Sequence, residues 1–300
     1  MENHSISERL GKYEILGRVA MTSGGGLSKI QVKSDRSTAE IYLHGAHVTG
    51  FQKNSEPPLL FVSAKSHFVP GQPIRGGVPV CFPWFGNRDG EPTHGFARIV
   101  EWQLVKTSTA PDGAAILTFG LPQIPGREVW KNLCAEFVVT IAETLTMELI
   151  TANDTCGETL EIENCLHTYF HVGDIGAVSI SGLEKLPFDD FAFGAGGVRR
   201  AAENSILRIT KETNRVYPNA TGAVEIHDEK LRRIIRVEKS NSRATVVWNP
   251  WTTQKLPDDF DPAEYTAMVC VESGNLKQNK ISLAPGKTTS LKVMLSSQPL

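Results

Sequence analysis

Short runs in which apolar and polar residues alternate recur along the whole chain, and this pattern most limits the folds open to it. Such alternation is typical of strands with one buried face, and Val, Ile, Thr and aromatic residues fill the runs. Gly, Pro, Asn and Asp stand between them, as expected of turns. The predicted strands are 41–48, 115–119, 137–141, 145–151, 160–172, 206–209, 234–237, 245–248, 268–272 and 290–295.

Helical periodicity is nearly absent from the sequence, and only residues 262–265 are expected to form a helical turn. Many short strands without helices between them predict an all-β fold. Because so many strands cannot all lie in one flat sheet, we expect two or more packed, mostly antiparallel sheets. The 26 glycines and 17 prolines are scattered, without a repeat or a linker. This predicts a lead-in over 1–20 and one domain over 21–300.

Charge and composition exclude several classes of protein. With 31 basic and 33 acidic residues the net charge is −2, so no positive field favours nucleic acid or an anionic membrane. No apolar run is long enough to span a bilayer, and the N-terminus has no signal-peptide core. We therefore predict a cytoplasmic protein, and a monomer because no large apolar segment is exposed.

The cysteines support a reducing compartment. Their number is odd, and no C-x-x-C pair occurs, which favours reduced thiols over a disulfide framework. The five cysteines are Cys81, Cys134, Cys156, Cys165 and Cys270.

The stretch 73–86, PIRGGVPVCFPWFG, is apolar and has one charge, Arg75. Pro79 and Pro83 exclude a central strand or a helix there. Because a buried guanidinium needs a partner, two interpretations of Arg75 are open. It forms a structural salt bridge with a carboxylate, or it binds an anionic ligand.

A second basic motif follows at 93–98, THGFAR. His94 is either a hydrogen-bonded loop histidine or a donor to a ligand oxygen. Together with Arg75, Arg98 would give an anion site with two guanidiniums.

Two further motifs carry groups that can transfer protons. In 164–171, NCLHTYFH, a strand would place Cys165, His167 and Tyr169 on one face. In 267–275, AMVCVESGN, Glu272 ends an apolar strand; it either points into water or is desolvated with a raised pKa, suited to a general base. The H-E-x-x-H pattern is absent and no Cys/His spacing supports a metal, so none is predicted.

Taken together, these motifs resemble a known family. PIRGGVPVCFPWFG, THGFAR, LHTYF, VVWNPW, MVCVESGN and ISLAPGK occur in an order similar to that of the hexose-6-phosphate mutarotases, a branch of the aldose 1-epimerases. The similarity runs from about Ile41 to Pro285. The resemblance implies a galactose-mutarotase-like β-supersandwich that interconverts the α and β anomers of an aldohexose 6-phosphate without a cofactor.

The resemblance also implies roles for individual residues. His167 and Glu272 correspond to the catalytic pair, and Arg75, His94 and Arg98 to residues that bind the phosphosugar. Thr93 stands where the family often has Gln, and Asn214 where it often has Asp. Asn214 can still hydrogen-bond a hydroxyl, but it lacks the charge.

Anomerisation requires one acid and one base. We expect Glu272 to act as the base on the C1 hydroxyl and His167, as an imidazolium stabilised by the nearby carboxylate, to act as the acid on the ring oxygen. The guanidiniums would hold the phosphate far from C1. Two alternatives remain: a mutarotase for unphosphorylated aldoses, and a non-catalytic sugar-phosphate-binding protein on the same fold.

Overall fold

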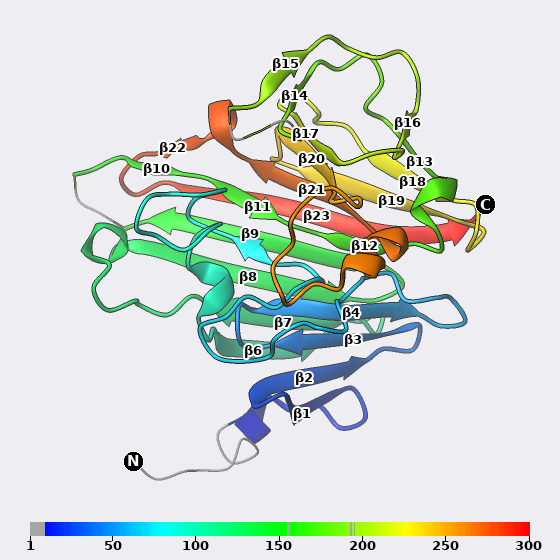
Figure 1. The fold of residues 1–300 in the computed structure, drawn as a ribbon. Helices are drawn as coiled ribbons and strands as arrows, with labels where there is room; N and C mark the ends of the chain where they lie inside the picture. Colours follow the sequence, from blue (N-terminus) through cyan, green and yellow to red (C-terminus); the bar gives the residue numbers. More distant parts are fainter. Residues whose placement is uncertain (1–9, 155–156, 193, 195) are drawn as a thin grey trace.

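The computed structural model describes residues 10–154, 157–192, 194 and 196–300, and their regular secondary structure is mainly antiparallel strands (Figure 1). The N-terminal sheet contains, in order, β1 (Val19–Gly24), β2 (Leu27–Lys33), β3 (Ser37–Tyr42) and β4 (His47–Lys53). The nine-stranded sheet contains, in order, β16 (Leu207–Arg208), β13 (Val178–Ser181), β18 (Val224–Asp228), β19 (Arg233–Ser240), β23 (Thr288–Pro299), β9 (Leu145–Asn153), β8 (Leu133–Ile141), β7 (Ala115–Gly120) and β6 (Gln103–Thr109).

The eight-stranded sheet carries most of the chemistry-bearing motifs. It contains, in order, β15 (Val198–Arg200), β14 (Phe188–Asp190), β17 (Thr213–Tyr217), β20 (Ala244–Asn249), β21 (Met268–Asn275), β11 (Asn164–Leu166) and β5 (Val80–Cys81), with β12 (Tyr169–His171) also paired to β21. A two-stranded sheet joins β10 (Leu160–Ile162) to β22 (Ile281–Leu283). The 3₁₀ helices are η1 (Gly11–Tyr13), η2 (Ala97–Ile99), η3 (Glu128–Trp130), η4 (Ile175–Ala177), η5 (Pro262–Ala267) and η6 (Lys277–Asn279).

The alternating pattern produces the core. Along β8 and β9 every second residue is buried, and the two strands form an antiparallel hairpin, as predicted. Their buried side chains join those of the other two large sheets in one apolar cluster that includes Ile41, Phe137 and Val271. The chain is therefore an all-β assembly of packed antiparallel sheets, as the sequence predicts.

Strand β21 differs from β8 and β9 because all eight of its residues are buried. Val269 and Val271 pack into the main core, whereas Met268 and Cys270 belong to a separate cluster on the opposite face. A central strand covered on both faces can hold a carboxylate away from water, and this is the strand that carries Glu272.

Two predicted strands are interrupted in the structure. The run 160–172 divides into β10, β11 and β12, and the run 41–48 is broken by a turn with Gly45 and Ala46 in the left-handed region. Residues 80–81 form a strand at the sheet edge, which agrees with the exclusion of a central strand by Pro79 and Pro83. The predicted helical turn at 262–265 lies within η5.

The thiols Cys81, Cys165 and Cys270 are free and buried, whereas Cys134 is free and exposed. Cys156 lies outside the described residues. Among the described helices, none combines the length and the apolar character needed to cross a bilayer.

Candidate active site

Glu272 lies on the face of β21 that turns away from the main core. Its side chain is only 1% exposed, so the interpretation of a strand-end glutamate in water is wrong. The Cys165 thiol on β11 donates to Glu272 Oε2 at 3.5 Å. On this face of the sheet the Cys165 thiol and the His167 ring contact the carboxylate and keep it from water.

His167 lies in the irregular segment between β11 and β12, facing Glu272. Its backbone N–H donates to the Pro79 carbonyl at 3.0 Å, which ties it to the predicted proline-rich loop. Its ring is stacked on Tyr169, with centroids 4.8 Å apart. His167 Nε2 lies 3.2 Å from Glu272 Oε1. The two residues expected to catalyse proton transfer are therefore in direct contact.

His94 lies beside this pair and is held rigidly. Its backbone φ is +63°, in the left-handed region, and Nδ1 accepts a hydrogen bond from the Gly86 N–H at 3.2 Å. The ring contacts that of His167, with centroids 5.5 Å apart. Because Nδ1 is an acceptor, a neutral His94 carries its proton on Nε2 and can donate it to a ligand.

Arg98 lies in η2 and is 8% exposed. Its Nη2 donates to the Thr93 carbonyl at 2.7 Å, while its buried Nε has no hydrogen-bond partner. Within the described part of the chain no carboxylate forms an ion pair with Arg98. The Thr93 hydroxyl instead donates to Asn87, so position 93 holds Arg98 through its backbone.

Arg75 has a different environment. Its Nε and Nη2 both contact the Asp259 carboxylate at 3.2 Å, a bidentate ion pair. Of the two interpretations drawn from the sequence, the structure thus shows the salt bridge. The guanidinium still lines the same cavity as Arg98, but Asp259 balances its charge.

These residues converge on one cavity of about 970 Å³. Asn214 on β17 lines it, opposite Trp248 in the β17–β20 ladder. Trp248 packs edge-on against both Tyr169 and His167. All six residues proposed from the sequence therefore line this cavity: Arg75, His94, Arg98, His167, Asn214 and Glu272.

Burial and neighbouring charges shift the proton affinities of the central pair in opposite directions. Burial raises the pKa of Glu272 to about 8, although the Cys165 hydrogen bond and the charge of Arg98 oppose this. Burial lowers the pKa of His167 to about 3, and the guanidiniums of Arg98 and Arg75 lower it further. Both shifts oppose the imidazolium expected from the sequence and favour, in the free site, a neutral His167 beside a protonated Glu272.

Three side chains of the site stand close enough to be tested as metal ligands. His167, Cys270 and Glu272 each place one potential ligand atom within 4.8 Å of the others. Burial raises the pKa of the Cys270 thiol well above its usual value, which disfavours the thiolate that a metal would bind. The pair of His167 and Glu272 accounts for acid–base chemistry without a metal, so the metal-free site remains a prediction.

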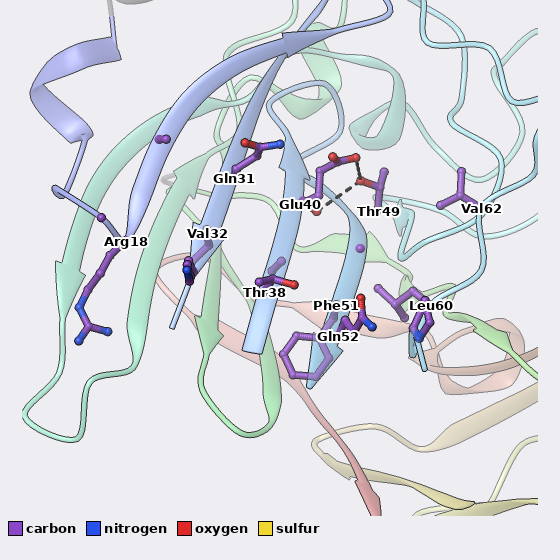
Figure 2. A pocket seen from close by; sticks show the side chains of 16 residues that line it. Arg18, Gln31, Val32, Thr38, Glu40, Thr49, Phe51, Gln52, Leu60 and Val62 are labelled. Atoms are coloured by element: carbon purple, nitrogen blue, oxygen red, sulfur yellow. Dashed lines mark hydrogen bonds between the residues drawn. The ribbon is translucent and has the colours of Figure 1, made fainter. Parts of the chain in front are cut away.

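A second hollow, of about 680 Å³, lies over the N-terminal sheet (Figure 2). Its carboxylate, Glu40, accepts from Thr49 Oγ1 at 3.0 Å and pairs with Lys29 at 2.7 Å. Its guanidinium, Arg18, contacts Asp35 at 3.2 Å. Because these charged groups are already paired, the hollow offers less for catalysis than the cavity around Glu272.

Several residues of the cavity belong to no motif selected from the sequence. Lys277, Asp259 and Glu212 line or support it. A basic residue five positions after Glu272 on the same chain segment is the one sequence signal for Lys277. Asp259 follows no motif, and only the tertiary contact with Arg75 reveals it.

The family of the chain follows from its sequence as well as from this site. Residues 28–296 match the family model for aldose 1-epimerase, and the chain belongs to this family. A "Putative glucose-6-phosphate 1-epimerase" from Cenchrus ciliaris is 33% identical, covering 91% of this chain and 86% of that protein. A protein with the same name from Escherichia coli is 37% identical, covering 82% of this chain and 83% of that protein.

Solved structures agree with the fold. The crystal structure of a "putative mutarotase (YeaD)" from Salmonella typhimurium has a TM-score of 0.86 at 26% identity, covering 99% of this chain and 100% of that chain. Galactose 1-epimerase from Lactobacillus acidophilus has a TM-score of 0.67 at 12% identity, covering 94% of this chain and 99% of that chain, a likeness of fold alone. The chain is thus an isomerase of the aldose 1-epimerase family with a galactose-mutarotase-like fold.

Proposed function

We propose that this mutarotase interconverts the α and β anomers of an aldohexose 6-phosphate, with glucose 6-phosphate as the first candidate. The observation that carries the proposal is the buried Arg98, which lines the cavity with no carboxylate partner in the described part of the chain. A buried, unbalanced guanidinium is costly and favours an anionic ligand. The names of the curated relatives support the same substrate.

The reaction removes one proton and delivers another. A base takes the proton of the C1 hydroxyl while an acid protonates the ring oxygen, so the C1–O5 bond breaks and an aldehyde forms. Rotation about the C1–C2 bond then turns the other face of the aldehyde toward the O5 hydroxyl. The reverse proton transfers close the ring and give the other anomer. His167 and Glu272 lie 3.2 Å apart, and one proton shared between them would supply one acid and one base.

A phosphate would set the roles within this pair. Its negative charge would oppose the guanidinium field that lowers the pKa of His167. The same charge would raise the pKa of Glu272 less, because only one of the two guanidiniums, Arg98, lowers that pKa, whereas Arg98 and Arg75 both lower that of His167. A sufficiently larger rise at His167 would move the proton from Glu272 to His167, leaving a carboxylate base for the C1 hydroxyl and an imidazolium acid for the ring oxygen. Asn214 and His94 would hydrogen-bond hydroxyls or the ring oxygen and so hold the sugar in position.

One observation favours an unphosphorylated sugar as the second candidate. Asp259 neutralises Arg75, so the cavity has one free guanidinium rather than the two expected. A neutral aldose would still meet the catalytic pair and Asn214.

Two-dimensional exchange NMR on the anomeric protons tests the proposal. We expect the wild type to accelerate exchange strongly for glucose 6-phosphate and weakly for glucose, relative to enzyme-free samples. Equal acceleration would support the unphosphorylated substrate. No acceleration of either would contradict the proposed reaction and leave the sugar-phosphate-binding alternative.

We propose a cytoplasmic location as well. The free, buried thiols Cys81, Cys165 and Cys270 support it, because thiols persist in reducing compartments. The monomeric state remains a prediction from the sequence.

A further inference from the structure

Lys277 is a cation of the cavity that no motif identified. It begins η6, directly after β21, and lines the cavity with Arg98 and His94. Its ammonium lies 5.3 Å from the centre of the Phe191 ring. In the described part of the chain it forms no ion pair with a carboxylate. It shares this property with Arg98, whereas Asp259 balances the charge of Arg75.

The backbone at Lys277 is held in an unfavourable conformation. Its φ is +58°, a region that side chains with a Cβ rarely occupy, and His94 shares this feature at +63°. Such strain persists only where surrounding contacts impose it, and it is frequent at functional sites. Lys277 and His94 line the same cavity, and both have this strained backbone. We infer that the surrounding structure holds their side chains in place at the cost of that strain.

Glu163 supplies the contact that holds Lys277 in place. Its Oε1 accepts from the Lys277 N–H at 2.5 Å, and its Oε2 accepts from the Phe85 N–H at 2.9 Å. Phe85 packs edge-on against His94, with ring centroids 4.6 Å apart. One carboxylate therefore fixes two segments of the cavity rim, the one before His94 and the one that carries Lys277.

Lys277 and Arg98 occupy different electrostatic positions in the cavity. Both charges lower the pKa of His94, after the larger effect of burial. Arg98 also lowers the pKa of Glu272, so its charge acts on the catalytic carboxylate itself. The Lys277 ammonium lies instead beside the Phe191 ring and Gly86, on the segment that Glu163 holds. The phosphate on C6 of a pyranose is the group most distant from the reacting C1 hydroxyl.

The space around the ammonium suits a ligand. A Cβ placed on Gly86 would lie 3.9 Å from Lys277 Nζ, so the ammonium lies over a backbone segment without a side chain. Gly86 also binds His94 through two hydrogen bonds, one in each direction. A ligand between Lys277 and His94 would therefore lie against a backbone segment that is held in place and carries no side chain.

We propose that Lys277 is a specificity-determining residue that binds the substrate phosphate together with Arg98, and that Glu163 is its positioning residue. The inference rests on the proposed function. An ammonium is a compact charge with three donors and suits a terminal phosphate dianion. Arg98 then binds the phosphate on the side of the catalytic pair. Lys277 makes the enzyme bind a phosphorylated hexose more tightly than an unphosphorylated one.

The test compares Lys277→Met and Lys277→Arg with the wild type, using glucose 6-phosphate and glucose. We expect Lys277→Met to raise the KM for glucose 6-phosphate about tenfold or more, because a charged hydrogen bond is lost. Its kcat, and the kcat/KM for glucose, should stay within about twofold, the range expected without a lost contact. Lys277→Arg should recover most of the affinity.

Glu163→Gln tests the positioning role. One of the two backbone N–H groups would then face an amide NH2, so Lys277 should lose its fixed position. We expect the KM for glucose 6-phosphate to rise more than the KM for glucose, because only the phosphate ester loses Lys277, although Phe85 beside His94 is disturbed for both sugars. No further selective rise is expected when Glu163→Gln is added to Lys277→Met. A parallel loss with both sugars would show that Glu163 is only structural and would overturn this part.

The outcomes separate the two proposals. If the wild type accelerates glucose 6-phosphate exchange but Lys277→Met leaves its KM unchanged, or raises the KM for both sugars equally, the inference about Lys277 is wrong and the proposed function stands. If the wild type does not prefer glucose 6-phosphate over glucose, the proposed function fails, and the inference fails with it.

Discussion

The cavity around Glu272 and the hollow over the N-terminal sheet differ in what their charges contact. In the hollow, Glu40 is paired with Lys29 and Arg18 contacts Asp35. In the cavity, Glu272 and His167 are in contact and buried from water, and Arg98 has no carboxylate partner in the described part of the chain. Both regions are large enough for a sugar. The comparison shows that unbalanced, desolvated charge distinguishes the site better than volume.

The largest difference between the two regions should appear when a carboxylate is replaced by its amide. Glu272→Gln removes the group that exchanges a proton with the C1 hydroxyl, and we expect kcat for anomer exchange to fall by about 10²–10⁴-fold. The matched control is Glu40→Gln in the hollow, which should retain activity within about twofold because its ion pair is partly exposed. Exchange NMR measures both, and preserved exchange in Glu272→Gln would refute the assignment of the base.

The arginines of the two regions provide the next comparison. Arg98→Met removes the buried guanidinium, and we expect the KM for glucose 6-phosphate to rise about 10- to 100-fold, the value of a charged hydrogen bond. The KM for glucose should change much less. Arg18→Met in the hollow is the control and should alter neither constant. Equal effects of Arg98→Met on both sugars would show that Arg98 does not contact the phosphate.

The pH dependence distinguishes the shared proton from an ordinary carboxylate. Because the pKa of Glu272 is raised to about 8, the pair keeps its proton up to that pH and loses it above. With glucose as substrate, kcat/KM should stay constant through neutral pH and fall about tenfold per unit above pH 8. An inflection at the usual carboxyl value of about 4.3, or at the usual imidazole value of about 6.5, would contradict the neutral pair.

The smallest effect is expected at Asn214. Its side chain lines the cavity and would bind a hydroxyl present in both sugars. Asn214→Ala should raise the KM for glucose and for glucose 6-phosphate alike, by about 2- to 10-fold, the value of a neutral hydrogen bond. Steady-state comparison of the two substrates checks this. A selective effect on the phosphorylated sugar would instead place Asn214 at the phosphate.

Much of the fold could be predicted because alternation is a local property. The hairpin of β8 and β9 and the helical turn at η5 are read directly from neighbouring residues. The division of 160–172 into three strands could not be predicted, since at the two breaks Glu163 and His167 bond to Pro83 and Pro79, far away in the sequence. Short strands such as β15 lack enough residues to show a period.

For the site, too, local motifs could be predicted from the sequence and tertiary contacts could not. Motifs identified six cavity residues, but charge balance is a tertiary property. Arg75 was open to two interpretations, and its ion pair with Asp259, 184 residues away, could not be read from a motif. The binding of an anion by Arg75 stays a prediction. The downward shift of the His167 pKa could not be predicted, because the sequence reveals the nearby carboxylate but neither the burial nor the convergence of two guanidiniums. The role of Glu163 depends on two backbone N–H groups, which no motif displays.

The central claim is that an anionic sugar turns a neutral pair into a charged one. Histidine labelled with ¹³C at Cε1 allows the His167 imidazole to be titrated by NMR, with its resonance assigned by loss in His167→Gln. The ligands are 1,5-anhydroglucitol 6-phosphate, which lacks the C1 hydroxyl and cannot react, and its unphosphorylated counterpart. We predict a neutral imidazole at pH 7 in the free protein and with the neutral ligand, and an imidazolium with the phosphate ester. An imidazole that titrates near its usual pKa in the free protein, or that responds equally to both ligands, would contradict the claim.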